Sequence, residues 1–237
     1  MESQTHNLET TLKTLDLFGK LKPEKRVEII KPKVKRNETL DLIVEKYKEG
    51  LENYGLYIEG NLKIKISKGE FDYYYIAKSS ALSKISSNNI TEFSLLLGEH
   101  ENKKHFEWFT GLYLSALINS SKDKDFKIFT NYLSKTIHEI GYKNTKNIDV
   151  NGNVGVAVGW YMKDGEITIN RNAGAFVGWD MKDGEITING NVGDEVGSGM
   201  KDGKIHLNGE YKRLSDEIYG GNIYHKDKLI VENGRKL

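Results

Sequence analysis

The chain has 237 residues, and a hydrophobic fraction of 38% is enough to build the core of one large domain or two small ones. Its 35 basic and 34 acidic residues leave a formal charge of +1, so the chain has no large net positive charge to attract nucleic acid or an anionic membrane. The absence of cysteine excludes disulfides, cysteine-bound zinc, iron–sulfur clusters and a thiol nucleophile. With no secretory signal and no stretch of about 18 apolar residues, we expect a cytoplasmic protein without a membrane span.

A basic run lies near the N-terminus, between Lys20 and Arg36. Eight lysines and arginines occur there against Glu24 and Glu28 alone, which gives a local net charge of +6. No aromatic residues alternate with these charges, whereas proteins that bind single-stranded nucleic acid stack its bases on aromatic rings. The run is therefore interpreted as a solvated strand and its flanks, and nucleic-acid binding through Lys20–Arg36 stays a less favoured alternative.

A helix is predicted after Asn37, whose short polar side chain can cap it and precedes apolar residues at 3.6-residue spacing. This stripe consists of Leu40, Ile43, Val44, Tyr47, Leu51 and Tyr54. Strand-like runs separated by glycine follow and predict a β-meander. The three runs are Leu56–Glu59, Leu62–Ser67 and Glu70–Ala77.

Three more helices are predicted before residue 147. Two are the strongly apolar segments Ile90–Leu97 and Phe106–Ile118. The last is expected from about Asp125 to Ile140, with apolar side chains on one side and Gly141 as its C-terminal stop. Residues 1–146 are thus expected to form an α+β domain of unknown type.

The C-terminal residues 147–237 repeat with a period of 19. They hold 16 of the 24 glycines, and a Lys-Asp-Gly triplet recurs at 163–165, 182–184 and 201–203. Other residues also recur at equivalent places. They are Ile148, Ile167, Ile186 and Ile205; Val158, Val177 and Val196; Met162, Met181 and Met200; and Asn151, Asn170, Asn189 and Asn208.

A unit of about 19 residues is too short for a helical hairpin and fits one coil of a β-solenoid, with coils stacked about 4.8 Å apart. The isoleucine, valine and methionine ladders are predicted to fill the interior, while Thr168 and Thr187 point outward and the asparagines form a ladder. The glycine of each triplet is expected at positive φ in a tight corner. Caps are expected from the residues before 147 at one end and from 210–220 and 229–231 at the other.

The pattern Gly-Asn-Val-Gly-x-x-Val-Gly-x-x-Met-Lys-Asp-Gly-x-Ile resembles the GXGXG repeat found in the large chain of glutamate synthase and in formylmethanofuran dehydrogenase. The resemblance covers residues 147–237 and implies a right-handed parallel β-helix, here of about four coils. It also implies a scaffolding role, because in that family the helix holds catalytic domains or subunits together. The chain lacks the flavin, iron–sulfur and amidotransferase parts of a synthase, so we do not expect that enzyme.

Histidines and glycine loops give little sign of chemistry. His100 and His105 are five residues apart, whereas a two-histidine zinc helix needs four. His138 is interpreted as a surface or capping imidazole on the last helix. The segment from Gly197 to Gly203 nearly imitates a dinucleotide loop, but its last gap is one residue too long.

A column of like charges, Asp164, Asp183 and Asp202, invites a calcium site between coils. The neighbouring lysines of the same triplets neutralise it, so the calcium site is not favoured. No catalytic residue, cofactor or metal site is therefore expected.

The repeat positions whose residues differ from coil to coil are predicted to form the functional surface. Two coils are apolar at positions where the third carries Asp194, Glu195, Ser198 and Gly199. Trp160 and Trp179 are 19 residues apart, so their rings should stack. The candidate docking patch consists of Val156, Trp160, Tyr161, Phe176 and Trp179. The leading hypothesis is a non-enzymatic scaffold or protein-interaction module that binds a protein partner or itself. An enzyme with an unrecognised active site, in the N-terminal domain or at the domain junction, is the alternative.

Overall fold

The computed structural model describes residues 34–58 and 85–237, which belong to one compact unit. Two of the sequence-based predictions fall at least partly outside these ranges. Most of the basic run Lys20–Arg36 lies there, as do the strand-like runs Leu62–Ser67 and Glu70–Ala77. No helix among the described residues is long and apolar enough to cross a bilayer.

Among the residues that the structure describes, three α-helices and a short 3-10 helix precede the strands. They are α2 (Glu38–Ile58), α4 (Ser87–Ser94), η3 (Leu97–Glu99) and α5 (Phe106–Ser120). The Asn37 cap is confirmed, because its Oδ1 accepts the Leu40 N–H at 2.9 Å, and the whole predicted stripe of α2 is buried. The strand predicted to begin at Leu56 is wrong, since the helical spacing of Leu51 and Tyr54 continues to Ile58 and keeps this segment in α2.

The helix predicted over residues 125–140 is also wrong. Strand β1 (Asp125–Phe129) pairs in parallel with β2 (Asn147–Asn151), which aligns Phe126 with Ile148. Its side chains alternate between exposed and buried, as in a strand with one buried face. Gly141 does take positive φ, at +79°, but it closes a turn of a coil and not a helix.

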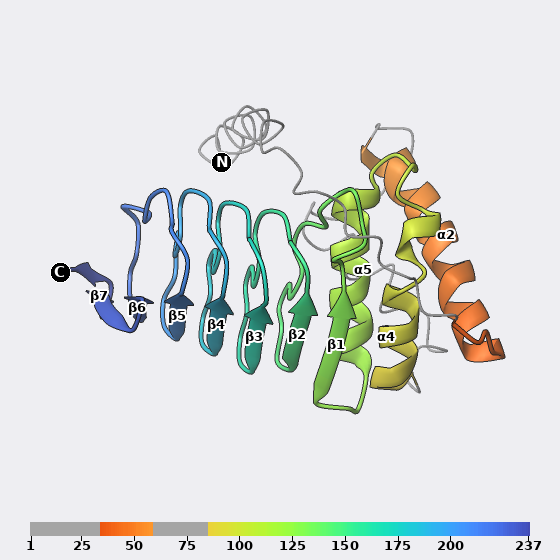
Figure 1. Ribbon diagram of the computed structural model, residues 1–237, viewed down its shortest axis with the longest axis horizontal. Coiled ribbons are helices and arrows are strands. Elements are labelled where there is room, and N and C mark those ends of the chain that lie inside the picture. Colours follow the sequence, from red (N-terminus) through yellow and green to blue (C-terminus); the bar gives the residue numbers. More distant parts are fainter. Residues whose placement is uncertain (1–33, 59–84) are drawn as a thin grey trace. The chain divides into compact units, whose positions relative to one another are not determined.

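Residues 125–221 form a parallel β-solenoid of about five turns, which confirms the predicted fold class and extends the predicted four coils (Figure 1). Its further strands are β3 (Glu166–Ile169), β4 (Glu185–Ile188), β5 (Lys204–Leu207) and β6 (Asn222–His225). Each coil is named here by the strand that begins it: the β1 coil (125–146), β2 coil (147–165), β3 coil (166–184), β4 coil (185–203) and β5 coil (204–221).

The interior ladders are confirmed. The four repeated isoleucines face one another in register, each at most 2% exposed, and the repeated valines and methionines are fully buried. A glycine column opposite them makes room, because a Cβ at Gly159 would lie 2.5 Å from Ile186 Cδ1. Thr168 and Thr187 point outward between buried neighbours.

The Lys-Asp-Gly triplets close one corner of each coil as predicted. Gly165 has φ of +80°, and the Asp164 carboxylate accepts its N–H at 2.7 Å. The Asn ladder runs from Asn170 through Asn189 to Asn208, with amide hydrogen bonds of 3.2 and 2.8 Å. Asn170 bonds to Asp149 in place of the expected Asn151.

Both ends of the solenoid are covered. Helix α5 packs on the β1 coil, where Ser115 Oγ accepts the Gly141 N–H at 2.9 Å and the Glu107 carbonyl accepts the His138 N–H at 2.8 Å. At the other end β7 (Lys228–Glu232) pairs antiparallel with β6 and with β8 (Arg235–Lys236), and buries Val231. The cap predicted at 229–231 is confirmed, whereas 210–220 belongs to the β5 coil. The division into domains at 146 and 147 stays a prediction, although the ladder starts at Asp125.

Candidate functional site

A row of aromatic side chains follows one flank of the solenoid across its first three coils. The indoles of Trp160 and Trp179 stack with centroids 4.8 Å apart and planes 9° apart, which confirms the predicted stack. We call this row the aromatic flank. It consists of Tyr142, Trp160, Tyr161, Phe176 and Trp179.

The coil backbone places these rings side by side. Tyr161 and Phe176 adopt left-handed φ of 55° and 61°, and the hydrogen bond from the Tyr161 N–H to the Trp179 carbonyl, at 2.9 Å, ties consecutive coils together. Rings at equivalent positions of consecutive coils therefore stack at about the spacing of neighbouring strands.

The members of the aromatic flank differ in how far they reach solvent. All five except Tyr142 are partly exposed, and Trp160 and Tyr161 also pack against the core. Val156, from the predicted docking patch, is only 5% exposed, so its side chain offers a partner almost no surface. Tyr142 was missed because the β1 coil lacks the repeat motif; its ring lies 5.2 Å from that of Trp160.

The flank changes from apolar to charged at the β4 coil. Asp194 and Glu195 stand there in the columns of Ala175 and Phe176, and they form ion pairs with Lys212, at 3.6 Å, and with Arg213. Burial raises the pKa of Asp180 above its ordinary value, although the charge of Lys201 and a hydrogen bond with the Tyr161 hydroxyl oppose this shift. The aromatic flank thus ends at a rim of carboxylates.

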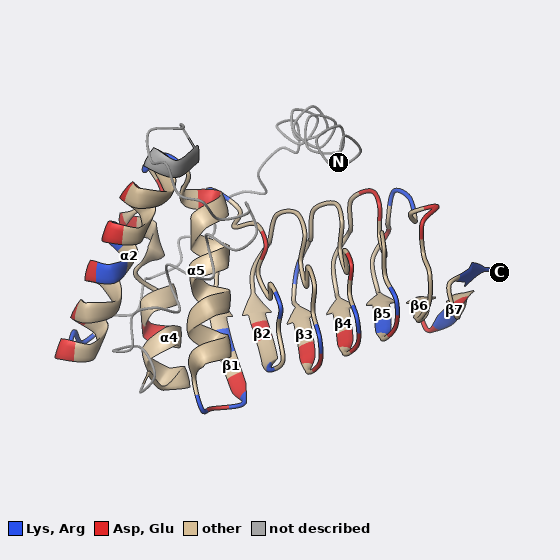
Figure 2. Ribbon diagram, turned by 180° about the vertical axis from the view of Figure 1, so that it is seen from behind, with Lys and Arg blue, Asp and Glu red and all other residues tan. Residues whose placement is uncertain are grey.

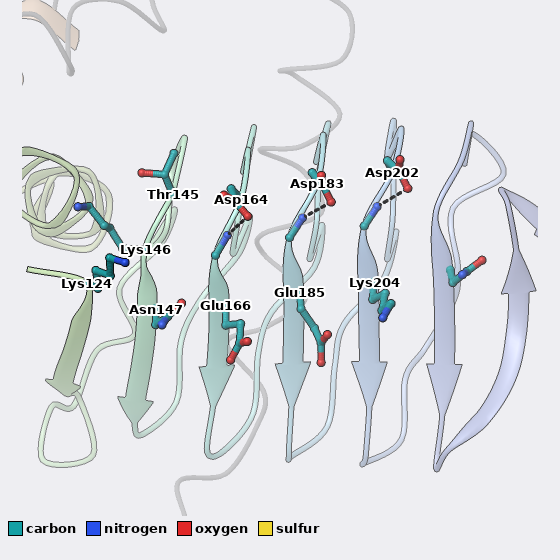
Figure 3. Close-up of a pocket in the computed structure, with 14 residues that line it drawn as sticks. Lys124, Thr145, Lys146, Asn147, Asp164, Glu166, Asp183, Glu185, Asp202 and Lys204 are labelled. Carbon is teal, nitrogen blue, oxygen red and sulfur yellow. Dashed lines mark hydrogen bonds between the residues drawn. The ribbon is translucent and has the colours of Figure 1, made fainter.

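A groove of about 670 Å³ lies elsewhere, along the Lys-Asp-Gly corners (Figure 3). The Asp164, Asp183 and Asp202 carboxylates line it, but each accepts the N–H of the next glycine at 2.7 to 2.8 Å. Glu166 of β3, Glu185 of β4 and Lys204 of β5 border it (Figure 3), and Figure 2 shows acidic residues in red on β3 and β4 and basic residues in blue on β5. Within residues 34–58 and 85–237, no three acidic or histidine side chains are placed to hold a metal ion.

The histidines considered for metal binding lie in the helical part. The ring of His100 is 5% exposed and lies 5.3 Å from that of Tyr47, and burial lowers its pKa. His105 precedes α5 with φ of +62° and lies 5.9 Å from the Tyr54 ring. Both rings therefore contact tyrosines of α2.

His138 lies in the β1 coil and not on a helix, so its interpretation as a helix-capping imidazole is wrong, and its side chain is half-buried. Its ring is 4.4 Å from that of Trp108, and its Nδ1 accepts the Val156 N–H at 3.1 Å. Burial lowers its pKa from 6.5 to about 4. The neutral imidazole therefore joins α5 to the first two coils.

We expect this histidine to make the protein less stable in acid. Because its pKa is lower in the folded than in the unfolded chain, the unfolded chain binds more protons below pH 6.5. Stability should fall as the pH drops from about 6.5 to about 4, by about 2–3 kcal/mol from this group. Urea unfolding of wild type and His138→Asn across this range measures it, because asparagine keeps an acceptor and does not titrate. Parallel pH profiles of the two proteins would contradict the prediction.

The segment from Gly197 to Gly203 supplies coil corners, with both end glycines at positive φ, and the described part of the basic run is only residues 34–36. No family model, curated protein or solved structure matches this chain. The GXGXG resemblance therefore stays a prediction.

Proposed function

We propose that this chain is a non-enzymatic scaffold that holds a protein partner on the aromatic flank. The supporting observation is the stack of Trp160 on Trp179, which leaves partly exposed rings side by side on two neighbouring coils. Large aromatic side chains that share one patch carry much of the binding energy in protein interfaces.

Two other features agree with a scaffold. The solenoid is closed by α5 at one end and by β7 at the other, so its flanks are the surfaces that remain for contact. In the family that the GXGXG pattern resembles, the helix holds other domains or subunits together. The aspartates of the groove at the corners are already bonded to backbone N–H groups, which favours a structural role for them.

The test uses the full chain with Trp160→Ser and Trp179→Ser together, since Ser198 occupies the equivalent place in the β4 coil. We expect the partner captured by the wild type from its native organism to be lost, and the purified partner to bind the variant at least tenfold more weakly. Tyr219→Ser is the matched control, because Tyr219 is an exposed aromatic residue of the same solenoid. Equal binding by wild type and double variant, with unchanged mass in solution, would refute the proposal.

A further inference from the structure

Trp179 is the last ring of the stack. Trp160 covers one face of its indole, at 4.8 Å, and Phe176 lies beside it with centroids 5.5 Å apart and planes 40° apart. The β4 coil carries Ser198 and Gly199 at the positions equivalent to Trp179 and Asp180. No described ring from that coil stacks on the indole. One coil beyond Trp179 and Asp180, the repeat therefore carries small residues in place of a ring and a carboxylate.

A carboxylate lies on the side of the β4 coil. Asp180 Oδ1 reaches over the β4 coil, where a Cβ at Gly199 would meet it at 2.6 Å. Among the described residues Asp180 forms no ion pair, although the charges of Lys201 and Lys182 act to lower its pKa. Burial raises its pKa, so this partly desolvated carboxylate would gain from a cation beside it.

The next coil holds a carboxylate that already has a cationic partner. Glu195 lies one coil beyond Phe176, and its carboxylate is bonded to the guanidinium of Arg213 from the β5 coil. The β3 coil offers a carboxylate and an aromatic face without such a cation. A guanidinium is planar, stacks on indole and can pair with a carboxylate in the same plane, whereas an ammonium is a point charge.

Resting on the proposed function, we propose that the partner's docking segment carries an arginine that stacks on the outer face of Trp179 and pairs with Asp180. The apolar rings of the aromatic flank then bind the residues beside that arginine. The partner is thus a protein segment with arginine next to apolar side chains.

The test is a selection of displayed random 12-residue peptides on the full chain, with counter-selection on Trp179→Ser. We expect enrichment of peptides with arginine beside apolar residues. Replacing that arginine by citrulline, its neutral isostere, should weaken binding at least tenfold, as should Asp180→Asn. Asparagine tolerates the φ of +50° at this position, so the variant removes charge without backbone strain.

Glu166→Gln is the matched control, since it removes one carboxylate from the strand face and should leave peptide binding unchanged. Selected peptides that need Trp179 but bind equally well with citrulline or to Asp180→Asn would overturn the arginine inference and leave the proposed function standing. Selection of no peptide that depends on Trp179 would also overturn the inference. The proposed function is then decided separately by the binding of the captured partner to the tryptophan double variant.

Discussion

Replacing Gly111 with alanine is expected to cost about 3 kcal/mol of unfolding free energy, although alanine is favoured over glycine in helices by about 1 kcal/mol. A Cβ at residue 111 would lie 1.7 Å from the His138 carbonyl oxygen and 2.8 Å from its carbonyl carbon. Both atoms are backbone, so α5 would have to move away from the β1 coil. Urea unfolding and near-ultraviolet circular dichroism of the variant measure the loss.

Gly55→Ala supplies the matched control. Gly55 lies within helix α2, and a Cβ there would meet its nearest neighbour, His105 Cδ2, at an ordinary 3.4 Å. This variant should be neutral or more stable by up to about 1 kcal/mol, as helix propensity alone predicts. Equal stability changes at the two glycines would show that the close approach of α5 to the β1 coil does not matter.

Ile186→Ala is expected to cost about 2–5 kcal/mol, because it leaves a cavity in the middle of the interior ladder. Ile186 is fully buried and aligned with Ile167 and Ile205 on the two neighbouring strands. Its Cδ1 also fills the space left by the missing side chain of Gly159. The free energy of urea unfolding checks the value.

The adjacent Thr187 provides the comparison, because it points outward from the same strand. Thr187→Ala should change stability by about 0.5 kcal/mol or less, as surface substitutions usually do. A cost at Thr187 equal to that at Ile186 would mean that the strand faces have been assigned the wrong way round.

The repeat made the solenoid predictable, because residues 19 apart must occupy equivalent places. The Ile, Val and Met ladders and the stack of Trp160 on Trp179 follow from that single period. The role of the repeated glycines Gly159 and Gly178 could not be predicted from the period. Gly159 and Gly178 are needed because isoleucine tips from another coil lie against them, and the period alone does not say which columns face each other across the interior.

The first coil was missed for a physical reason. Phe126, Phe129, Leu133, Ile137 and Ile140 have the spacing of a helix face, and the β1 coil carries neither the Lys-Asp-Gly triplet nor the valine column. Pairing of β1 with β2 outweighs that local pattern, since it extends the ladder and buries Phe126 and Ile128. Tyr142, the first ring of the aromatic flank, was overlooked with it.

The covered ends give the solenoid a length that can take only certain values. Because α5 closes one end and the β6–β7 hairpin closes the other, the distance between these two ends is set by the number of coils between them. Inserting a second copy of residues 170–188 would move the hairpin by one strand spacing, about 4.8 Å, and leave α5 in place. The spacing of whatever binds near the two ends can therefore change only in whole steps, one repeat at a time.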